Sequence, residues 1–213
     1  MMYAMASARI VFSFVRGVLT FFKDEIGRGT FPANFSSLIK AQEIAEDMSW
    51  AELIEEKARK YGDRPFLIYE DKEYTFRQMD ERANKAANFL LSLGAGKGKG
   101  VAIIMANCPE YLDVYIGSQK LGMYSIPINT SLRGDSLLYI LNHSDAEFIV
   151  IDEEFLDVYK KIADKLKKKK TVIVNLPTDA KASGLSQGML NLADAYKQSD
   201  QKPNVKYDKN DIC

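Results

Sequence analysis

Alternating and helical patterns near residue 70 predict a β-hairpin followed by a helix. Segments 66–69 and 72–74 are short β-prone runs on either side of an acidic dipeptide suited to a tight turn. Thr75 lies three residues before Gln78, which is the spacing of a capping box at the start of a helix. Apolar residues then recur at helical intervals until Gly94, which predicts one buried helix face: Met79, Ala83, Ala86, Ala87, Leu90 and Leu91.

Four apolar runs separated by helical patterns predict a parallel sheet. Residues 101–105 form a continuous apolar run, typical of a strand buried on both faces. Further strands are expected at 124–128, 147–151 and 171–174, with helices at 109–121, at 136–141, and from Asp152 to a lysine-rich end at 165–170. Strand–helix–strand repeated three times indicates an α/β fold, a parallel βαβ sheet preceded by the hairpin and by an amphipathic helix.

The leading amphipathic helix is expected within the first 46 residues. Residues 10–22 form a wide apolar arc, interrupted by polar side chains at steps of three and four. Thirteen helical residues span about 20 Å, short of the roughly 30 Å hydrocarbon core. We therefore expect a helix lying in the membrane interface, with these contacts: Phe12, Phe14, Arg16, Phe21 and Phe22. Packing against the protein itself or another subunit, and a short crossing segment, stay open.

The patterns divide the chain into three parts. Residues 1–46 are expected to form the membrane-associated leader, and residues 47–197 the α/β domain. Beyond Asn175 the periodicity fades, residues 189–196 suit a short helix, and residues 198–213 form a hydrophilic linker.

Charge and composition narrow the classes of function. The 29 Lys and Arg residues balance the 29 Asp and Glu residues, and no basic stripe suited to nucleic acid is present. His143 is the single histidine and the two cysteines are far apart, so neither a metal site nor a disulfide framework is expected. A glycine-rich loop at 94–100 follows a helix and precedes a strand, the reverse of a phosphate-binding loop, and is interpreted as a flexible connection.

Candidate ligand-binding residues follow the first two strands of the predicted parallel sheet, at 101–105 and 124–128. Asn107, Asn129 and Arg133 are expected near the carboxyl ends of these strands, where open parallel sheets bind ligands. The Arg133 guanidinium could clamp a phosphate or carboxylate, or it could brace its own loop. Cys108 precedes a helix, whose N-terminus could lower the pKa of the thiol, although a packing role is the simpler interpretation.

Dispersed motifs resemble the opening of the adenylate-forming, or AMP-dependent synthetase/ligase, superfamily. The similar positions are Tyr74-Thr75-Phe76, Gln78, Met79, Asn84, Ala87, Leu90, Gly98, Val101-Ala102, Asn107, Pro109-Glu110, Gly122 and Pro127. Segment 128–133 (INTSLR) resembles the fatty-acid transport protein, or very-long-chain acyl-CoA synthetase, branch, whereas other branches more often carry Asn-Pro there. The resemblance covers residues 47–213.

The resemblance implies a two-step ligase reaction. A fatty acid carboxylate attacks the α-phosphate of ATP with Mg²⁺ present, giving an acyl-adenylate and pyrophosphate, and coenzyme A then takes the acyl group. The phosphate-binding loop of the superfamily would directly follow Ile212-Cys213. The chain is therefore expected to be an N-terminal fragment, without catalytic residues of its own and without bound ATP, Mg²⁺ or CoA.

The resemblance and the apolar leader together imply partners and a location. Fatty acid and CoA are the expected partners of the complete enzyme, a membrane surface and a homodimer are further expectations, and the domain is expected to face the cytoplasm. Two alternatives stay open. The chain could be a non-catalytic membrane-tethering or dimerisation module, or part of a medium-chain or aryl acid–CoA ligase.

Overall fold

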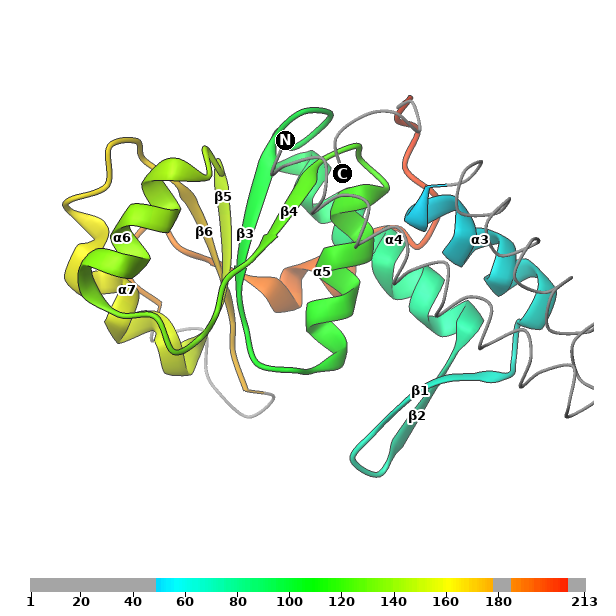
Figure 1. Cartoon of the computed structure of the whole chain (residues 1–213). Helices are drawn as coiled ribbons and strands as arrows, with labels where there is room; N and C mark the ends of the chain where they lie inside the picture. The colour runs from blue at the N-terminus through cyan, green and yellow to red at the C-terminus, as the bar shows by residue number, and fades with distance from the viewer. Residues whose placement is uncertain (1–48, 178–184, 207–213) are drawn as a thin grey trace, which may run out of the picture. The chain divides into compact units, whose positions relative to one another are not determined.

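The computed structural model describes residues 49–177 and 185–206 (Figure 1). The chain divides into two units, Met1–Met48 and Ser49–Cys213, and the described residues belong to the second. The end of the predicted linker, residues 207–213, lies outside the described part, as do the predicted leader and its membrane contacts Phe12, Phe14, Arg16, Phe21 and Phe22. Across the described residues, every helix is too short or too polar to cross a membrane.

The predicted hairpin and the helix after it are both present. Strands β1 (Pro65–Tyr69) and β2 (Lys72–Thr75) pair antiparallel, and α4 (Phe76–Ser92) follows at once. The capping box is complete: the Thr75 N–H donates to Gln78 Oε1 at 2.9 Å, and the Gln78 N–H donates to Thr75 Oγ1 at 3.2 Å. A second capping box, made by Ser49 and Glu52, opens α3 (Trp50–Tyr61). These caps satisfy main-chain donors that the first turn of a helix leaves without partners.

The buried face of α4 differs from the prediction at one position. Leu91 is 38% exposed, whereas the other five predicted residues are buried. Each helical residue turns by about 100°, so Leu91 points away from the side that Leu90 buries. Phe89 takes part in the core instead.

A five-stranded sheet forms the centre of the described unit. Its order is β4-β3-β5-β6-β7, and every neighbouring pair is parallel. The strands are β3 (Gly100–Ile104), β4 (Tyr124–Pro127), β5 (Phe148–Asp152), β6 (Thr171–Asn175) and β7 (Leu190–Asn191). The predicted α/β class and the parallel sheet are confirmed. Strand β7 was not predicted, and the helix expected at 189–196 is replaced by β7 and the 3-10 helix η3 (Leu192–Lys197).

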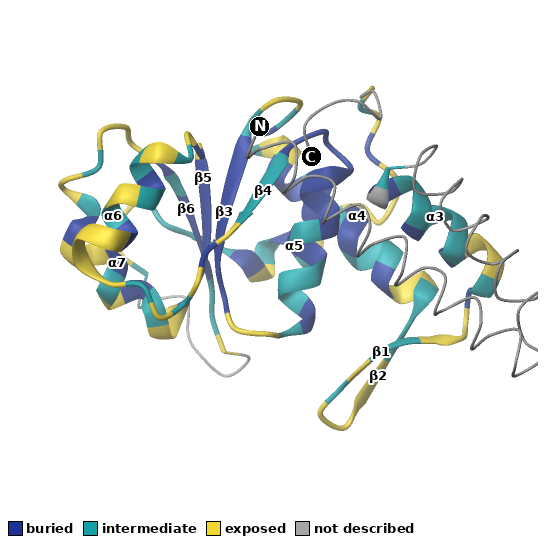
Figure 2. Cartoon of the chain, in the orientation of Figure 1, coloured by how far each residue is buried: buried dark blue, intermediate teal, exposed yellow. Residues whose placement is uncertain are grey.

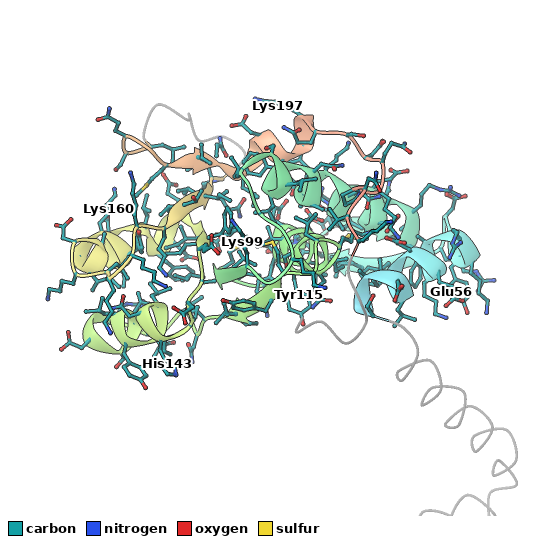
Figure 3. The ribbon with its side chains drawn as sticks, turned by 90° about the horizontal axis from the view of Figure 1, so that it is seen from above. Glu56, Lys99, Tyr115, His143, Lys160 and Lys197 are labelled. Atoms are coloured by element: carbon teal, nitrogen blue, oxygen red, sulfur yellow. The ribbon has the colours of Figure 1, made fainter. Side chains whose placement is uncertain are left out.

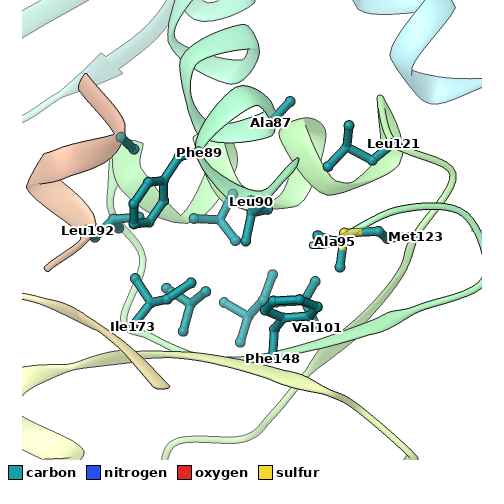
Figure 4. Packing of buried hydrophobic residues seen from close by; sticks show 14 of the residues in the cluster. Ala87, Phe89, Leu90, Ala95, Val101, Leu121, Met123, Phe148, Ile173 and Leu192 are labelled. Atoms are coloured by element: carbon teal, nitrogen blue, oxygen red, sulfur yellow. The ribbon is translucent and has the colours of Figure 1, made fainter. Parts of the chain in front are cut away.

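Helices cover both faces of this sheet. Alternate strand residues point to opposite faces, so Val101, Phe148 and Ile173 pack against α4, α5 (Pro109–Gln119) and η3 (Figure 4). Ala102 and Ile149 pack on the other side against α6 (Gly134–His143) and α7 (Leu156–Ala163). Strands β3 and β5 are buried throughout (Figure 2). Burying each large apolar side chain stabilises the fold by about 1.5–3 kcal/mol.

The helix after β5 is shorter than predicted. The 3-10 helix η1 (Glu153–Phe155) precedes α7, which ends at Ala163, so the lysine-rich segment 165–170 lies in the connection to β6 and not in the last helical turn. Lys170 is buried, and its ammonium group donates to the main-chain oxygen of Ala146. This lysine therefore has a main-chain partner inside the fold.

Candidate functional site

The connections of the sheet create a crevice between two neighbouring strands. The chain leaves β3 through α5 on one face, whereas it leaves the adjacent β5 through η1 and α7 on the other face. Such a reversal separates the loops that follow the two strands, and ligands of open α/β sheets bind in the space that this separation opens.

A cavity of about 920 Å³ lies at this crevice. Its walls come from the segments after β3, β5 and β6, from η1 and α7, and from Asn191, Ala193 and Tyr196. Tyr69 from the hairpin also lines it. Figure 3 locates Lys160 on α7, the element that contributes Leu156, Asp157 and Lys160 to the wall.

Asp152 ties together the ends of three strands in this cavity. Its Oδ2 accepts a hydrogen bond from the Ala106 N–H at 2.7 Å, and its Oδ1 accepts one from Asn175 Nδ2 at 2.9 Å. Burial raises the pKa of the Asp152 carboxyl group, while these two hydrogen bonds oppose the shift. Asp152 thus fixes the spacing of the strand ends, and its hydrogen bonds favour the charged form.

The cavity is strongly acidic. Five carboxylates line it, against one cation, Lys160, among the described residues of its wall: Glu110, Asp152, Glu153, Glu154 and Asp157. Burial raises the pKa of the half-buried Cys108 thiol to about 12, and the charges of Asp152 and Glu110 add to that effect. A main-chain hydrogen bond from Tyr111, at the start of α5, does lower this pKa, but burial outweighs it, so the packing role considered for Cys108 is the one the structure supports. Cys108 is a protonated thiol that packs against the core.

A buried ionic cluster adjoins the cavity at Tyr196. Arg82 of α4 binds Asp113 of α5 through two contacts, Nε to Oδ1 at 3.1 Å and Nη2 to Oδ2 at 2.6 Å. Arg82 Nη2 also lies 3.2 Å from Glu110 Oε1, and the Tyr196 hydroxyl donates to Asp113 Oδ2 at 2.5 Å. Burial raises the pKa of Asp113 to about 6, and Arg82 and Tyr196 oppose that shift. The cluster joins α4, α5 and η3.

Of the three predicted ligand-binding residues, one lies in the cavity and two lie in the loop after β4. Asn107 lines the cavity, whereas Asn129 and Arg133 are not part of its described wall. Asn129 Oδ1 accepts the Ser131 N–H at 2.8 Å, and Arg133 Nη1 donates to the main-chain oxygens of Leu132, at 2.8 Å, and of Thr130. Arg133 therefore braces its own loop, which is the second of the two roles considered for it.

Sequence reasoning missed the cluster of Arg82, Asp113 and Tyr196. Its members lie 31 and 83 residues apart along the chain, so no local pattern links them. One signal was available, because Arg82 lies three residues after buried Met79 and four before buried Ala86, on the same side of the helix, where a charge needs a partner.

No metal site is found in the described part of the chain. There, no three His, Cys, Asp or Glu side chains are arranged so that they could hold a metal ion. His143 lies at the end of α6 on the surface, with its ring stacked on Tyr139 at a centroid distance of 5.4 Å.

Comparison with protein families matches residues 54–213 to the AMP-binding enzymes. A crotonobetaine/carnitine–CoA ligase of Salmonella paratyphi B is 34% identical over 107 residues, which are 48% of this chain and 21% of the relative. The corresponding ligase of Salmonella paratyphi A is 30% identical over 125 residues, or 56% of this chain and 24% of the relative. The chain thus spans less than a quarter of the length of these curated relatives.

Solved structures share the fold. An anthranilate CoA ligase in complex with anthranoyl-AMP matches with a TM-score of 0.64 and 26% identity, over 71% of this chain and 28% of that chain. A fatty acyl CoA synthetase from Mycobacterium tuberculosis matches with a TM-score of 0.61 and 22% identity, over 76% of this chain and 30% of that chain. The described sheet and helices thus share the fold of part of each of these two chains.

Proposed function

Because the chain belongs to the family of AMP-binding enzymes, we propose that it is the N-terminal part of a long- or very-long-chain fatty acyl-CoA synthetase. The complete enzyme would join a fatty acid to AMP at the expense of ATP and then transfer the acyl group to CoA. The family match over residues 54–213 supports the enzyme class in this proposal. The CoA ligases among the relatives and solved structures support acyl-CoA formation as the reaction class.

We propose that the acidic cavity is not the ATP site of the complete enzyme. Five carboxylates line the cavity, and they would repel a triphosphate. No group of side chains that could hold a metal ion is found in residues 49–177 and 185–206. We therefore propose that adenylation requires residues beyond those described, and that this chain alone is not competent for it. Asn107, Asn129 and Arg133 stay candidates for ligand contact in the complete enzyme, and no step is assigned to them.

The fatty acid branch rests on the segment after β4. Residues 128–133 resemble the fatty-acid transport protein branch, and in the structure they form an ordered loop held by Asn129 and Arg133. An apolar leader at 1–46 suits the same branch, so we propose that the protein associates with a membrane. The α/β domain at 47–197 would face the cytoplasm, and residues 198–213 would form a linker. Homodimer formation belongs to the same proposal.

ATP–pyrophosphate exchange tests competence directly. The purified 213-residue chain should show no exchange above background with fatty acids, whereas a gene product extending past residue 213 should show exchange and form acyl-CoA. Tight, magnesium-dependent ATP binding by the 213-residue chain would contradict the proposal.

Two alternatives make different predictions. A medium-chain or aryl acid–CoA ligase is supported by the anthranilate CoA ligase match, and an extended protein of this kind would prefer medium-chain or aromatic acids in a chain-length series. A non-catalytic tethering or dimerisation module would be stable at its present length and would bind liposomes or self-associate. Deleting residues 1–30 should abolish liposome flotation if the leader binds membranes, and equal flotation would exclude that role.

A further inference from the structure

Residues 198–206, called the strap here, lie along α4 without forming a strand or helix (Figure 1, red). Asn84 Nδ2 donates to the Asp200 main-chain oxygen at 2.8 Å. Asn88 Nδ2 donates to the main-chain oxygens of Ser199, at 2.8 Å, and Gln201, at 2.9 Å. Asn84 and Asn88 are one helical turn apart and share a face of α4. Because both amides bind main-chain carbonyls, they fix the path of the strap directly.

The far end of the strap is held by charge and by apolar packing. Lys202 Nζ lies 2.7 Å from Glu55 Oε2 on α3. Pro203 is buried, and Val205 packs against the core cluster that covers one face of the sheet. The strap is therefore anchored on two helices and on the core.

The near end of the strap continues directly into the cavity wall. Asn191, Ala193 and Tyr196 line the cavity, and residue 198 begins the strap immediately after η3. Buried Leu192 and the hydroxyl of Tyr196 hold η3 itself. Wall and strap thus form one continuous segment, fixed at one end beside the cavity and at the other end on α3 and α4.

We propose that Asn84 and Asn88 are positioning residues, which hold the cavity wall in place by holding the strap. Short segments of this kind open locally, and their opening depends on the few contacts that anchor them. When the strap detaches, η3 keeps only its own contacts, which include those of Leu192 and of the Tyr196 hydroxyl. The part of the cavity wall formed by residues 191–196 then opens more often. This coupling concerns the described unit and is independent of the ligand and of the reaction proposed above.

Hydrogen exchange measured by mass spectrometry on the whole 213-residue chain tests the coupling. Asn88→Ala removes two hydrogen bonds and keeps a residue that favours helix. Ser92→Ala is the matched control, because it removes a hydrogen bond within the same helix, from Ser92 Oγ to the Phe89 main-chain oxygen. Asn88→Ala should raise the exchange rate of peptides covering 190–206 about tenfold, as the loss of two hydrogen bonds predicts. The control should leave these peptides unchanged.

A second readout follows the cavity itself. In a Cys213→Ser background, Cys108 is the single thiol and lines the cavity, so its labelling rate reports how often the wall opens. Both Asn88→Ala and Lys202→Gln, which weakens the far anchor, should speed this labelling. Faster exchange confined to the strap, with 190–197 and Cys108 unchanged, would overturn the coupling. Unchanged exchange in both Asn88→Ala and Lys202→Gln would overturn it too. So would an acceleration of exchange in β3 and β5 equal to that in residues 190–206, because the variant would then loosen the whole fold.

Discussion

At the scale of single residues, Lys120 stands out as a charge placed fully inside the fold. Its side chain has no exposed surface, and its ammonium group lies 2.7 Å from Asp80 Oδ1 and 3.1 Å from Glu55 Oε1. The two carboxylates come from α4 and α3, so this lysine at the end of α5 joins three helices. A buried charge is tolerated only when it is paired in this way.

Removing this charge should destabilise the protein. Lys120→Met keeps much of the side-chain volume but leaves Asp80 and Glu55 without their shared partner. We expect a loss of about 1–3 kcal/mol in the free energy of unfolding, because both carboxylates keep some access to water. Urea denaturation followed by circular dichroism measures it. Lys168→Met, in an exposed ion pair with Asp145, is the control and should leave the midpoint unchanged. Equal midpoints for the two variants would show that the buried pair contributes nothing.

At the scale of elements, the closest approach of α4 and α5 depends on Gly117. A Cβ atom at this position would lie 2.8 Å from the Ala83 main-chain oxygen and 3.0 Å from the Ala87 nitrogen. These neighbours are helix backbone and cannot rotate away. The small residues Ala83, Ala86 and Ala87 on the facing side serve the same contact, which places α4 close enough for Arg82 to reach Asp113.

Gly117→Ala tests this contact. Alanine favours helix over glycine by up to about 1 kcal/mol, but the clash with α4 costs about 1–3 kcal/mol, so we expect a net loss of stability. Gly96→Ala is the matched control, since its added methyl group meets nothing within 4 Å. Thermal denaturation should give a lower Tm for Gly117→Ala and an unchanged or slightly higher Tm for Gly96→Ala. A Tm increase in both variants would refute the close contact.

At the scale of the whole described unit, Glu55 joins the first helix to the last segment. It binds Lys120 and also Lys202, which lies 147 residues away along the chain. Burial alone would raise the pKa of Glu55, but the hydrogen bonds and charges of the two lysines outweigh it, so the pKa is lowered. The stabilising effect of this carboxylate is present above its unfolded pKa, near 4.5, and is lost as the pH falls through the lower folded value.

Glu55→Gln should therefore change the pH dependence of stability. Above about pH 5 the variant should unfold at lower urea concentration than the unsubstituted protein. Below the pKa of Glu55 the difference should shrink, because the native carboxyl group is then protonated as well. Urea midpoints measured between pH 3 and pH 7 check this. A difference that stays constant over the range would mean that Glu55 acts through packing and not through its charge.

The sequence by itself determined the elements whose signals are local. The capping box at Thr75 and Gln78, the buried runs of β3 and β5, and the alternation of strands and helices depend on residues close together in the chain, so the α/β fold followed from periodicity. Strand ends were expected to gather ligand-binding residues, and Asn107 does line the cavity there. Strand β7 was missed because two residues are too few to show the alternation of apolar and polar side chains that marks a strand.

Only the tertiary structure decided which distant side chains meet. The pairing of Arg82 with Asp113 and Tyr196, the burial of Lys120 between two carboxylates, and the docking of the strap on Asn84 and Asn88 all join residues that no local pattern connects. The raised pKa of Cys108 has the same origin, because burial and the charges of Asp152 and Glu110 outweigh the position of the thiol at the start of a helix. Helix packing brings such groups together, and their energies depend on the distances and the loss of water that packing creates.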